Sequence, residues 1–434
     1  MGGTFFIESL GCAKNQVDSE AMIAALEEAG FTFVETPDAA DVIVVNTCGF
    51  IEAAKKESID VCLGFKNRFP EKRLIMAGCL SQRYAAELAA EMPEIDAFVG
   101  NRDPREVARL ASGRPSRSSG PADPAAPCAF RHRLLSPAGS AYLKIAEGCD
   151  NRCSYCAIPI IRGPLACRDR ADVVREAREL LSRGIREIVL IAQDLGSYGL
   201  DRGRAELPEL LSELDGLPGS FWLRLLYIHP DRFPMGLLPV LKRSTHVLPY
   251  FDIPFQHASA RILAAMGRRG DADAYLDLIR SIRLSFPDAV IRTTFLTGFP
   301  GETEEDFQDL LDFQARAEPD WCGAFTYSRE EGTPAYALAG RVTKTAAARR
   351  KAAIEEAQIP ITARSLDRHV GRTCDVLLEE EVQGEGLWIG RAYMQAPEVD
   401  GLTVVAGKGL EPGAVVPVRI TRRNGVDLEG LAQG

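Results

Sequence analysis

The chain has 434 residues, a hydrophobic content of 46% and a formal net charge of −10. This size and composition are typical of a soluble globular protein with two or three domains. No apolar run reaches the 18 residues of a membrane helix, and the N-terminus lacks the pattern of a secretion signal. We therefore expect a cytoplasmic protein without a membrane partner, and its acidic charge offers no general attraction to nucleic acid.

Residues 4–100 alternate between strand and helix patterns. Strands are expected at Thr4–Ser9, Phe31–Val34, Asp41–Asn46, Arg73–Ala77 and Ala97–Gly100. Between them we expect a helix that Asp18 or Ser19 caps and Gly30 ends, and helices over about 52–66 and 81–90. Buried apolar strands that alternate with helices predict an open α/β domain of flavodoxin-like type, with residues 1–110 as its range.

Residues 111–140 are rich in Pro, Ala, Ser and Gly, which predicts an exposed linker. The alternation then resumes, with strands expected at 142–146, 187–192, 222–227, 250–255, 289–296 and 321–327. Helices fit between these strands, for example 171–183 before Gly184. Six strand–helix units predict an open, partial parallel (βα)6 barrel, and we assign it residues 141–370 with a trailing helical run.

The pattern changes again after Gly371. Short strands separated by glycine-rich turns are expected at 376–378, 387–389, 402–405 and 415–420. This pattern predicts a small all-β barrel over residues 371–434.

Cys149, Cys153 and Cys156 form a C-x3-C-x2-C run with Tyr155 before the last cysteine. The run follows the first expected strand of the central barrel, at the end where barrel enzymes build their active sites. Three thiolates in one loop can bind three irons of a four-iron cluster and leave the fourth iron open. A zinc site is the alternative, but the run contains no obvious fourth ligand.

A second set of cysteines, Cys12, Cys48 and Cys79, follows the first, third and fourth expected strands of the N-terminal domain. Carboxyl ends of parallel strands gather along one edge of a sheet, so the three thiols are expected to converge. A second cluster and a group of core or redox thiols both remain open. Small buried side chains are expected for the other cysteines, among which Cys128 falls in the linker: Cys62, Cys128, Cys167, Cys322 and Cys374.

The C-x3-C-x-aromatic-C run resembles the signature of the radical S-adenosylmethionine (SAM) superfamily. With both triads and a C-terminal β-barrel, nearly the whole chain resembles the radical SAM methylthiotransferases, in which that barrel is called TRAM. Two segments look like the RimO-type branch, which modifies a ribosomal protein: Ser9-Leu10-Gly11-Cys12-Ala13-Lys14-Asn15 and Asp252-Ile253-Pro254-Phe255-Gln256-His257-Ala258-Ser259. The transfer-RNA branch typically has Gln-Met-Asn where this chain has Ala13-Lys14-Asn15.

This resemblance implies two 4Fe-4S clusters and two SAM molecules per turnover. The first triad's cluster would reduce SAM to give a 5′-deoxyadenosyl radical, which removes hydrogen from an aspartate β-carbon of small-subunit ribosomal protein S-twelve. The Cys12, Cys48 and Cys79 cluster would carry the methylthio group. Because the cofactors carry this chemistry, no catalytic residue beyond the cluster ligands is expected. An electron donor such as a flavodoxin is implied, and the sulfur donor stays open.

SAM also needs polar contacts, and the expected strand ends supply the candidates. Burial of Arg224 on a barrel strand would require an anionic partner, which makes it the favoured single contact. The Gly298–Thr303 run resembles the family's segment near the adenosine part of SAM. As alternatives, Asp194 could be a helix cap and the glycines could be turn residues. The full candidate set is Tyr155, Gln193, Asp194, Arg224, Gln256, His257, Gly298 and Gly301.

The charge of the C-terminal barrel bears on the target molecule. Residues 373–434 contain ten acidic and five basic residues, a net charge of −5. An RNA-binding barrel would be expected to have a basic face, whereas an acidic barrel attracts a basic protein. The acids could instead serve only solubility. The alternative functions are a transfer-RNA adenosine methylthiotransferase and an iron–sulfur scaffold or electron-transfer protein.

Overall fold

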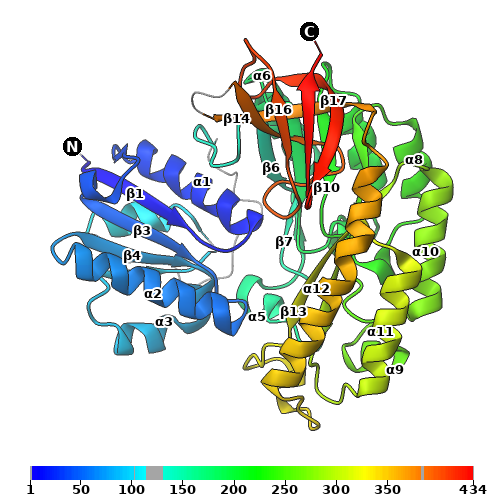
Figure 1. Cartoon of the computed structure of the whole chain (residues 1–434). Helices are drawn as coiled ribbons and strands as arrows, with labels where there is room; N and C mark the ends of the chain where they lie inside the picture. The colour runs from blue at the N-terminus through cyan, green and yellow to red at the C-terminus, as the bar shows by residue number, and fades with distance from the viewer. Residues whose placement is uncertain (1, 102, 114–130, 383–385, 434) are drawn as a thin grey trace. The chain divides into compact units, whose positions relative to one another are not determined.

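The protein is described by a computed structural model that covers residues 2–101, 103–113, 131–382 and 386–433. These residues divide into two compact units (Figure 1). The first contains the chain up to Leu135, Ala146–Arg168 and Ser328–Tyr336, and the second contains the rest. Most of the expected linker, with Cys128, lies outside the described residues. Within the described ranges, no helix is both long and apolar enough to cross a membrane.

The first unit is built on a parallel five-stranded sheet with the order β2-β1-β3-β4-β5. This is the flavodoxin-like order, which confirms the predicted fold class. The strands are β1 Thr4–Ser9, β2 Thr32–Phe33, β3 Val42–Thr47, β4 Arg73–Gly78 and β5 Ala97–Val99. The helices are α1 Ala13–Glu28, α2 Glu52–Arg68, α3 Cys79–Glu91 and α4 Glu106–Ala111.

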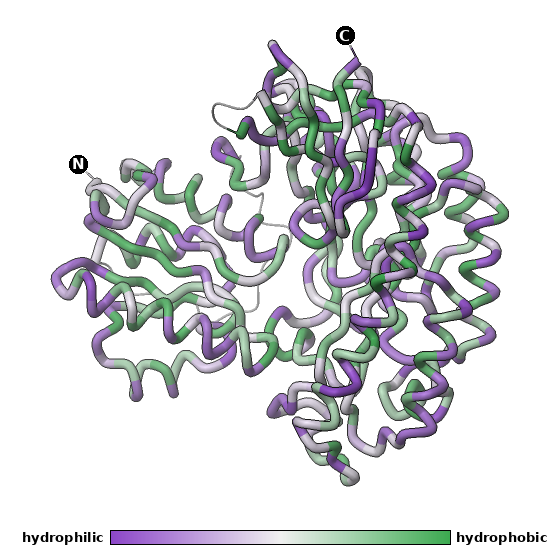
Figure 2. Tube along the Cα trace, in the orientation of Figure 1, coloured by the Kyte–Doolittle hydropathy of each residue, from purple (hydrophilic) through white to green (hydrophobic). Residues whose placement is uncertain are grey.

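Alternating side chains of the central strands create two apolar layers in this unit. Val44 of β3 packs on one face with Met22 and Leu26 of α1, and with the residues of α4. Val45 packs on the opposite face with Cys62 of α2 and the apolar side of α3. Figure 2 shows the hydrophobic residues concentrated in these strands. Such burial on both faces is typical of a parallel sheet covered by helices on either side.

The first helix begins earlier than the sequence predicted. It begins after Cys12, which occupies the N-cap position, and includes both Asp18 and Ser19. The prediction that Asp18 or Ser19 caps the helix was wrong because both side chains have distant partners. Asp18 forms an ion pair with Arg162, and Ser19 donates a hydrogen bond to Ser9.

The segment that contains the first cysteine triad folds as part of the first unit, whereas the sequence assigned it to residues 141–370. A short hairpin of β7 Ala146–Glu147 and β8 Ala166–Cys167 closes it at its base. Inside the hairpin lie the cysteine run and the helix α5, Ile158–Arg162. Contacts with α1 and α3, described below, hold this segment in the unit.

The second unit contains a parallel six-stranded sheet in sequential order, β6-β9-β10-β11-β12-β13. The two end strands β6 and β13 do not pair with each other, so the partial barrel is open, as predicted. The strands are β6 Ser140–Lys144, β9 Glu187–Ile191, β10 Trp222–Leu225, β11 Val247–Asp252, β12 Val290–Thr297 and β13 Trp321–Thr326. The helices are α6 Arg170–Ser182, α7 Leu207–Asp215, α8 Leu237–Arg243, α9 Ala260–Ala265, α10 Ala272–Ser285, α11 Glu304–Ala317 and α12 Lys344–Asp367.

A closed five-stranded β-barrel ends this unit, with the order β14-β15-β16-β18-β17. Its strands are β14 Thr373–Val382, β15 Leu387–Ala392, β16 Thr403–Ala406, β17 Val415–Asn424 and β18 Asp427–Ala432. The barrel itself was predicted, but β18 was missed. It pairs with β17 across the turn at Gly425. Gly430 interrupts its apolar pattern because a Cβ there would lie 2.4 Å from Val418 Cγ1.

A buried ionic network joins this β-barrel to the six-stranded sheet. The carboxylate of Glu187, the first residue of β9, accepts hydrogen bonds from Arg224 of β10 at 2.7 Å and from Arg391 of β15 at 2.6 Å. Arg391 also donates to Glu379 of β14, and Arg224 donates to the Tyr393 carbonyl. Glu187 and Arg224 have no exposed side-chain surface.

Candidate active site

The second cysteine triad lies at one edge of the first sheet. Cys12 caps α1 shortly after β1, Cys48 directly follows β3, and Cys79 is the first residue of α3 directly after β4. Because β1, β3 and β4 are neighbours in the parallel sheet, the structure brings the three cysteines to the same edge. Cys12 is exposed, Cys48 is half-buried and Cys79 is buried.

Two glycines allow the three segments to approach closely. A Cβ atom on Gly11 would lie 2.9 Å from Cys48 Cβ and 3.3 Å from Cys48 Sγ. A Cβ atom on Gly49 would lie 2.8 Å from the Cys79 carbonyl oxygen. Larger residues at either position would separate the cysteine-bearing segments, so the glycines set the size of this site.

The electrostatics of Cys48 and Cys79 favour thiols that deprotonate only when a metal binds. Burial raises the pKa of Cys48 to about 12, and the neighbouring Cys79 and Cys12 also raise it. Burial likewise raises the pKa of Cys79, against the opposing positive charge of Arg162. In the described part of the chain, no three His, Cys, Asp or Glu side chains are arranged to hold a single metal ion. Thiolates of a cluster each bind a different iron, and the triad's soft donors fit such a group.

Asparagine side chains fix the backbone around the second triad. Asn15 donates from Nδ2 to the carbonyl oxygens of Leu10 and Thr47, both at 3.0 Å. Asn46 donates to the Asn15 carbonyl at 2.7 Å and to Ser19 Oγ at 2.8 Å. These roles were not predicted from the sequence, although an asparagine at a strand end or in a helix's first turn is a recognisable signal.

Arg162, which was also not predicted from the sequence, contacts this site from α5. Its Nη2 atom lies 3.3 Å from Cys79 Sγ, 2.6 Å from Asn15 Oδ1 and 2.9 Å from Asp18 Oδ2. Its Nη1 atom donates to Glu147 at 2.8 Å. Only 2% of the Arg162 side chain is exposed. No sequence pattern could have linked residues separated by more than 80 positions.

The loop of the first triad begins with a backbone conformation and a close contact that only glycine permits. Gly148 has a φ of +70°, and a Cβ there would lie 1.9 Å from the Pro164 carbonyl oxygen. The Cys149 amide donates to the Gly163 carbonyl at 3.2 Å, and the Cys156 amide donates to Cys153 at 3.1 Å. All three cysteines and Tyr155 are half-buried. One short loop therefore carries three accessible soft donors, which fits a four-iron cluster with one open iron.

Three of the remaining cysteines differ from the expectation of small buried side chains. Cys62 is fully buried in α2, as expected. Cys167, Cys322 and Cys374 are only half-buried, so burial was predicted wrongly for these three.

Strand ends of the second unit carry most of the candidate SAM contacts. Gln193 and Asp194 follow β9, and Gln256 follows β11. Asp194 accepts hydrogen bonds from the amides of Gly196 and His229 at 3.0 Å each and from the Ser197 hydroxyl, so it acts as the cap that was considered as its alternative role.

Unusual backbone conformations recur at these strand ends. Tyr227 follows β10 and Gln256 follows β11, and both have a φ of +69°. Gly298 follows β12 with a φ of +77°. A non-glycine residue in this left-handed region is strained, and such strain gathers at functional sites. Tyr227 was not among the sequence candidates, because a tyrosine in the sequence does not indicate a positive φ.

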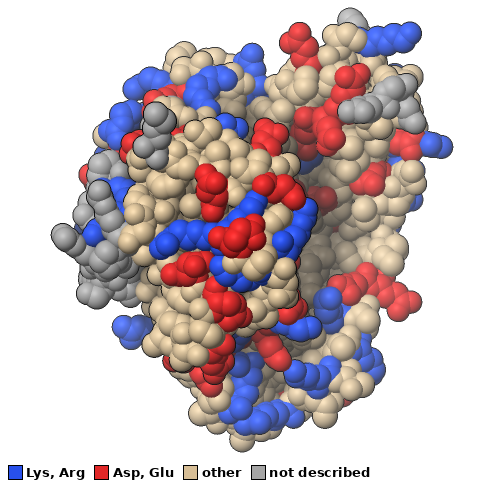
Figure 3. Space-filling model, turned by 90° about the vertical axis from the view of Figure 1, so that its left-hand side faces the viewer, with Lys and Arg blue, Asp and Glu red and all other residues tan. Residues whose placement is uncertain are grey.

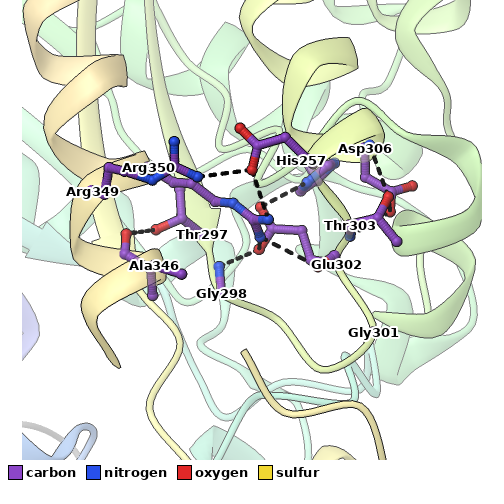
Figure 4. Close-up of polar contacts among 12 residues, drawn as sticks. His257, Thr297, Gly298, Gly301, Glu302, Thr303, Asp306, Ala346, Arg349 and Arg350 are labelled. Carbon is purple, nitrogen blue, oxygen red and sulfur yellow. Dashed lines mark hydrogen bonds and ion pairs between the residues drawn. The ribbon is translucent and has the colours of Figure 1, made fainter. Parts of the chain in front are cut away.

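His257 and Glu302 form a buried pair beside Gly298 (Figure 4). The Nδ1 atom of His257 accepts hydrogen bonds from the amides of Ala258 at 2.9 Å and Ser259 at 3.0 Å. In the neutral imidazole the ring proton therefore sits on Nε2, which lies 3.7 Å from Glu302 Oε1. The other carboxylate oxygen accepts the Gly298 amide and faces Arg350 at 3.4 Å.

Arg224 has its counter-ion inside the protein. Its guanidinium is paired with Glu187, and it also donates to the Tyr393 carbonyl at 2.8 Å. The anionic partner that a buried Arg224 was expected to need is Glu187, so the burial of Arg224 gives no reason to place it in contact with SAM. Gly301 has a φ of +86° and lies before α11, whose N-cap is Thr303.

Comparison with known families accounts for three consecutive regions of the chain. Residues 4–100 match the model described as uncharacterized protein family UPF0004, residues 143–313 match the radical SAM superfamily, and residues 370–432 match the TRAM domain. Membership of the radical SAM superfamily implies SAM and a 4Fe-4S cluster as cofactors. Among solved structures, the radical SAM methyltransferase TsrM from Kitasatospora setae has a similar fold, with a TM-score of 0.58 over 77% of both chains and 16% identity.

Curated relatives are similar over nearly their whole length. The chain is 42% identical to the ribosomal protein uS12 methylthiotransferase RimO of Treponema denticola, with 97% of this chain and 99% of the relative covered. The corresponding proteins of Pelotomaculum thermopropionicum and Desulfosudis oleivorans are 43% and 44% identical; 99% and 98% of this chain are covered, and 99% of each relative. With identity at this level over nearly the whole chain, the chain belongs to the RimO family of radical SAM methylthiotransferases.

Proposed function

We propose that this chain transfers a methylthio group to the β-carbon of an aspartate in ribosomal protein uS12, using two 4Fe-4S clusters. The observation that carries the proposal is the pair of cysteine triads. Cys149, Cys153 and Cys156 share one loop, while Cys12, Cys48 and Cys79 share one sheet edge, and both sets belong to the first compact unit.

When bound, the first cluster supplies one electron to SAM, whose cleavage gives a radical that can remove hydrogen from an unactivated carbon. The chain's own residues position and shield the reactants. The first triad would hold the SAM-binding cluster, and the second triad would hold the cluster that provides sulfur. We propose that SAM is contacted by Tyr155, Gln193, Gln256, His257, Gly298 and Gly301, with Asp194 fixing the turn beside Gln193. The enzyme also needs an electron donor such as a flavodoxin, and we expect it to act in the cytoplasm.

The surface of the β-barrel supports a basic protein as the target. Of its five basic residues, Arg391 is buried against Glu187 and Glu379, and Arg422 and Arg423 are paired with carboxylates. Glu380, Glu381 and Glu411 are exposed. The face that Figure 3 displays belongs mostly to the first unit, and acidic and basic side chains are interspersed on it. Among the described residues, Lys408 and Arg419 are the exposed basic residues of the barrel without a carboxylate ion pair. This is little positive charge to hold RNA phosphates, and a basic ribosomal protein complements the acidic barrel better.

The test supplies the anaerobically reconstituted protein with SAM, a strong reductant and either uS12 or transfer RNA. Mass spectrometry should find a methylthio group on the uS12 aspartate and none on the RNA. Modification of the RNA alone would establish the adenosine methylthiotransferase instead, and failure to form 5′-deoxyadenosine would favour a scaffold. Cys149→Ala should abolish SAM cleavage, whereas Cys12→Ala should retain cleavage and lose the thioether product.

A further inference from the structure

The segment that follows the first triad contacts the second triad at Cys79. Cys156 is followed directly by Ala157 and by α5. Ala157 and Ile161 are fully buried and pack with Cys79 in one apolar cluster. At the end of the same helix, Arg162 reaches Cys79 Sγ. Cys79 therefore has apolar carbon on one side and a guanidinium on another, all from the segment that begins after Cys156.

The Arg162 guanidinium is held in a fixed position by four partners. Nη1 is bonded to Glu147, while Nη2 faces Asn15, Asp18 and the Cys79 sulfur. A guanidinium buried to this degree needs paired carboxylates to offset its desolvation, and Asp18 and Glu147 meet this need. The ion pairs of Arg162 with Asp18 and Glu147 do not depend on a nearby sulfur atom. Ion pairing alone therefore does not explain why Arg162 also contacts Cys79.

Hydrogen bonds to ligating sulfurs and local charge are two of the properties that set the reduction potential of an iron–sulfur cluster. Reduction adds negative charge to the cluster and its sulfurs. A fixed N–H donor on a ligating sulfur stabilises the reduced form more than the oxidised form, and it raises the potential. Asp18 acts in the opposite direction, because its negative charge lies beside the same guanidinium nitrogen.

We infer that Arg162 is a positioning residue that raises the reduction potential of the second cluster through its hydrogen bond to Cys79. The inference rests on the proposed second cluster. It also means that the segment following the first triad tunes the cluster held by the second triad. Replacing Arg162 should lower the potential, and removing the Asp18 charge should raise it.

The test uses the full-length protein with Cys149, Cys153 and Cys156 changed to Ala, so that only the second cluster forms. After anaerobic reconstitution, iron analysis should give about four irons per chain. The midpoint potential is then measured by a redox titration followed by electron paramagnetic resonance. With Arg162→Gln added, the reduced-to-oxidised ratio at a fixed potential should fall about tenfold, which corresponds to about 59 mV for one electron. Asp18→Asn should shift the ratio in the opposite direction.

Two further variants separate tuning from structure. Arg162→Lys keeps a positive charge and an N–H donor, so it should recover part of the lost potential. Arg131→Gln is the matched control, because Arg131 is also buried in the first unit and paired with a carboxylate, that of Glu20. It should lower thermal stability without moving the potential.

Each outcome has a distinct meaning. If the triple variant binds no cluster, both the proposed second cluster and the role of Arg162 are overturned. If a four-iron cluster forms but its potential is the same with Arg162→Gln, the proposed function stands and the tuning role is overturned. An equal shift with Arg131→Gln would also overturn it, because the effect would then follow from a general loss of structure.

Discussion

Replacement of Glu187 by Gln should destabilise the second unit strongly. The Glu187 carboxylate is completely buried and bonds to Arg224 of the sheet and Arg391 of the β-barrel. The variant keeps the size of the side chain but removes the one acidic group, among the described residues, that contacts both guanidinium groups. Two buried positive charges would then share a neutral amide, and Arg391 would keep Glu379 as an acidic partner.

The expected magnitude follows from the pKa of Glu187. The charges of Arg391 and Arg224 more than offset burial and lower this pKa from 4.5 to about 2. Such a difference corresponds to about 3 kcal/mol of stabilisation of the charged form. Removing one partner of a buried ion pair typically costs about 3–5 kcal/mol, in agreement with this value. The variant should therefore lose about 3 kcal/mol of the free energy of unfolding.

The assay is urea unfolding at neutral pH, followed by circular dichroism. Glu213→Gln is the matched control, because Glu213 lies in the same unit and forms an exposed pair with Arg170 at 3.5 Å. Exposed pairs contribute about 0–1 kcal/mol, so the control should be nearly unchanged. Equal stability of wild type and Glu187→Gln would refute the claim that this network holds the barrel to the sheet.

The same pair of proteins gives a pH test with a defined sign. Because folding lowers the pKa of Glu187, its contribution is present above pH 4.5 and is lost as the pH falls from 4.5 to about 2. The stability difference between wild type and variant should shrink over this range. A difference that stays constant with acidification would contradict the assignment.

Three further predictions concern the two candidate sites. Gly148→Ala should lower the iron content of the first cluster, because the new Cβ would overlap the Pro164 carbonyl. The control is Gly163→Ala, because Gly163 has a similar positive φ but open space around a new Cβ. Equal iron loss in both variants would contradict the steric argument. His257→Phe should weaken SAM binding, measured by calorimetry, about tenfold or more, because it removes the Nε2 donor and the acceptor of two backbone amides. The control is the helix cap variant Asp271→Ala, which should bind SAM normally. Unchanged SAM affinity in His257→Phe would remove His257 from the SAM contacts. Asn15→Ala leaves two carbonyl oxygens without the hydrogen bonds of the Asn15 amide, and it should lower the free energy of unfolding by about 2–3 kcal/mol in thermal or urea unfolding. A loss below about 1 kcal/mol would contradict the bridging role of Asn15.

The sequence predicted features that depend on local patterns and on strand order. The convergence of Cys12, Cys48 and Cys79 followed from their positions after three apolar strands, because parallel strands place their carboxyl ends at one edge. Hydrophobic periodicity located the two parallel sheets and the β-barrel, which are governed by burial of local apolar faces. These are the levels at which sequence and fold agree most directly.

Long-range polar partners could not be predicted from the sequence. Arg224 was assigned to a ligand because its counter-ion, Glu187, is 37 positions away on a neighbouring strand. Asp18 was taken for a helix cap because its partner Arg162 is 144 positions away. The assignment of Ala146–Arg168 to the first unit depends on the same contact and on the packing of Ile161 against Cys79. Tertiary contacts of this kind override local propensity without leaving a periodic signal.

The central claim is that the chain holds two clusters, one on each triad, and an iron and sulfide count tests it most directly. Anaerobically reconstituted wild-type protein should contain about eight irons per chain, and the variant with Cys12, Cys48 and Cys79 changed to Ala should contain about four. The variant with Cys149, Cys153 and Cys156 changed to Ala should also contain about four. About four irons in the wild type, all lost with the Cys149 triad, would contradict the two-cluster account.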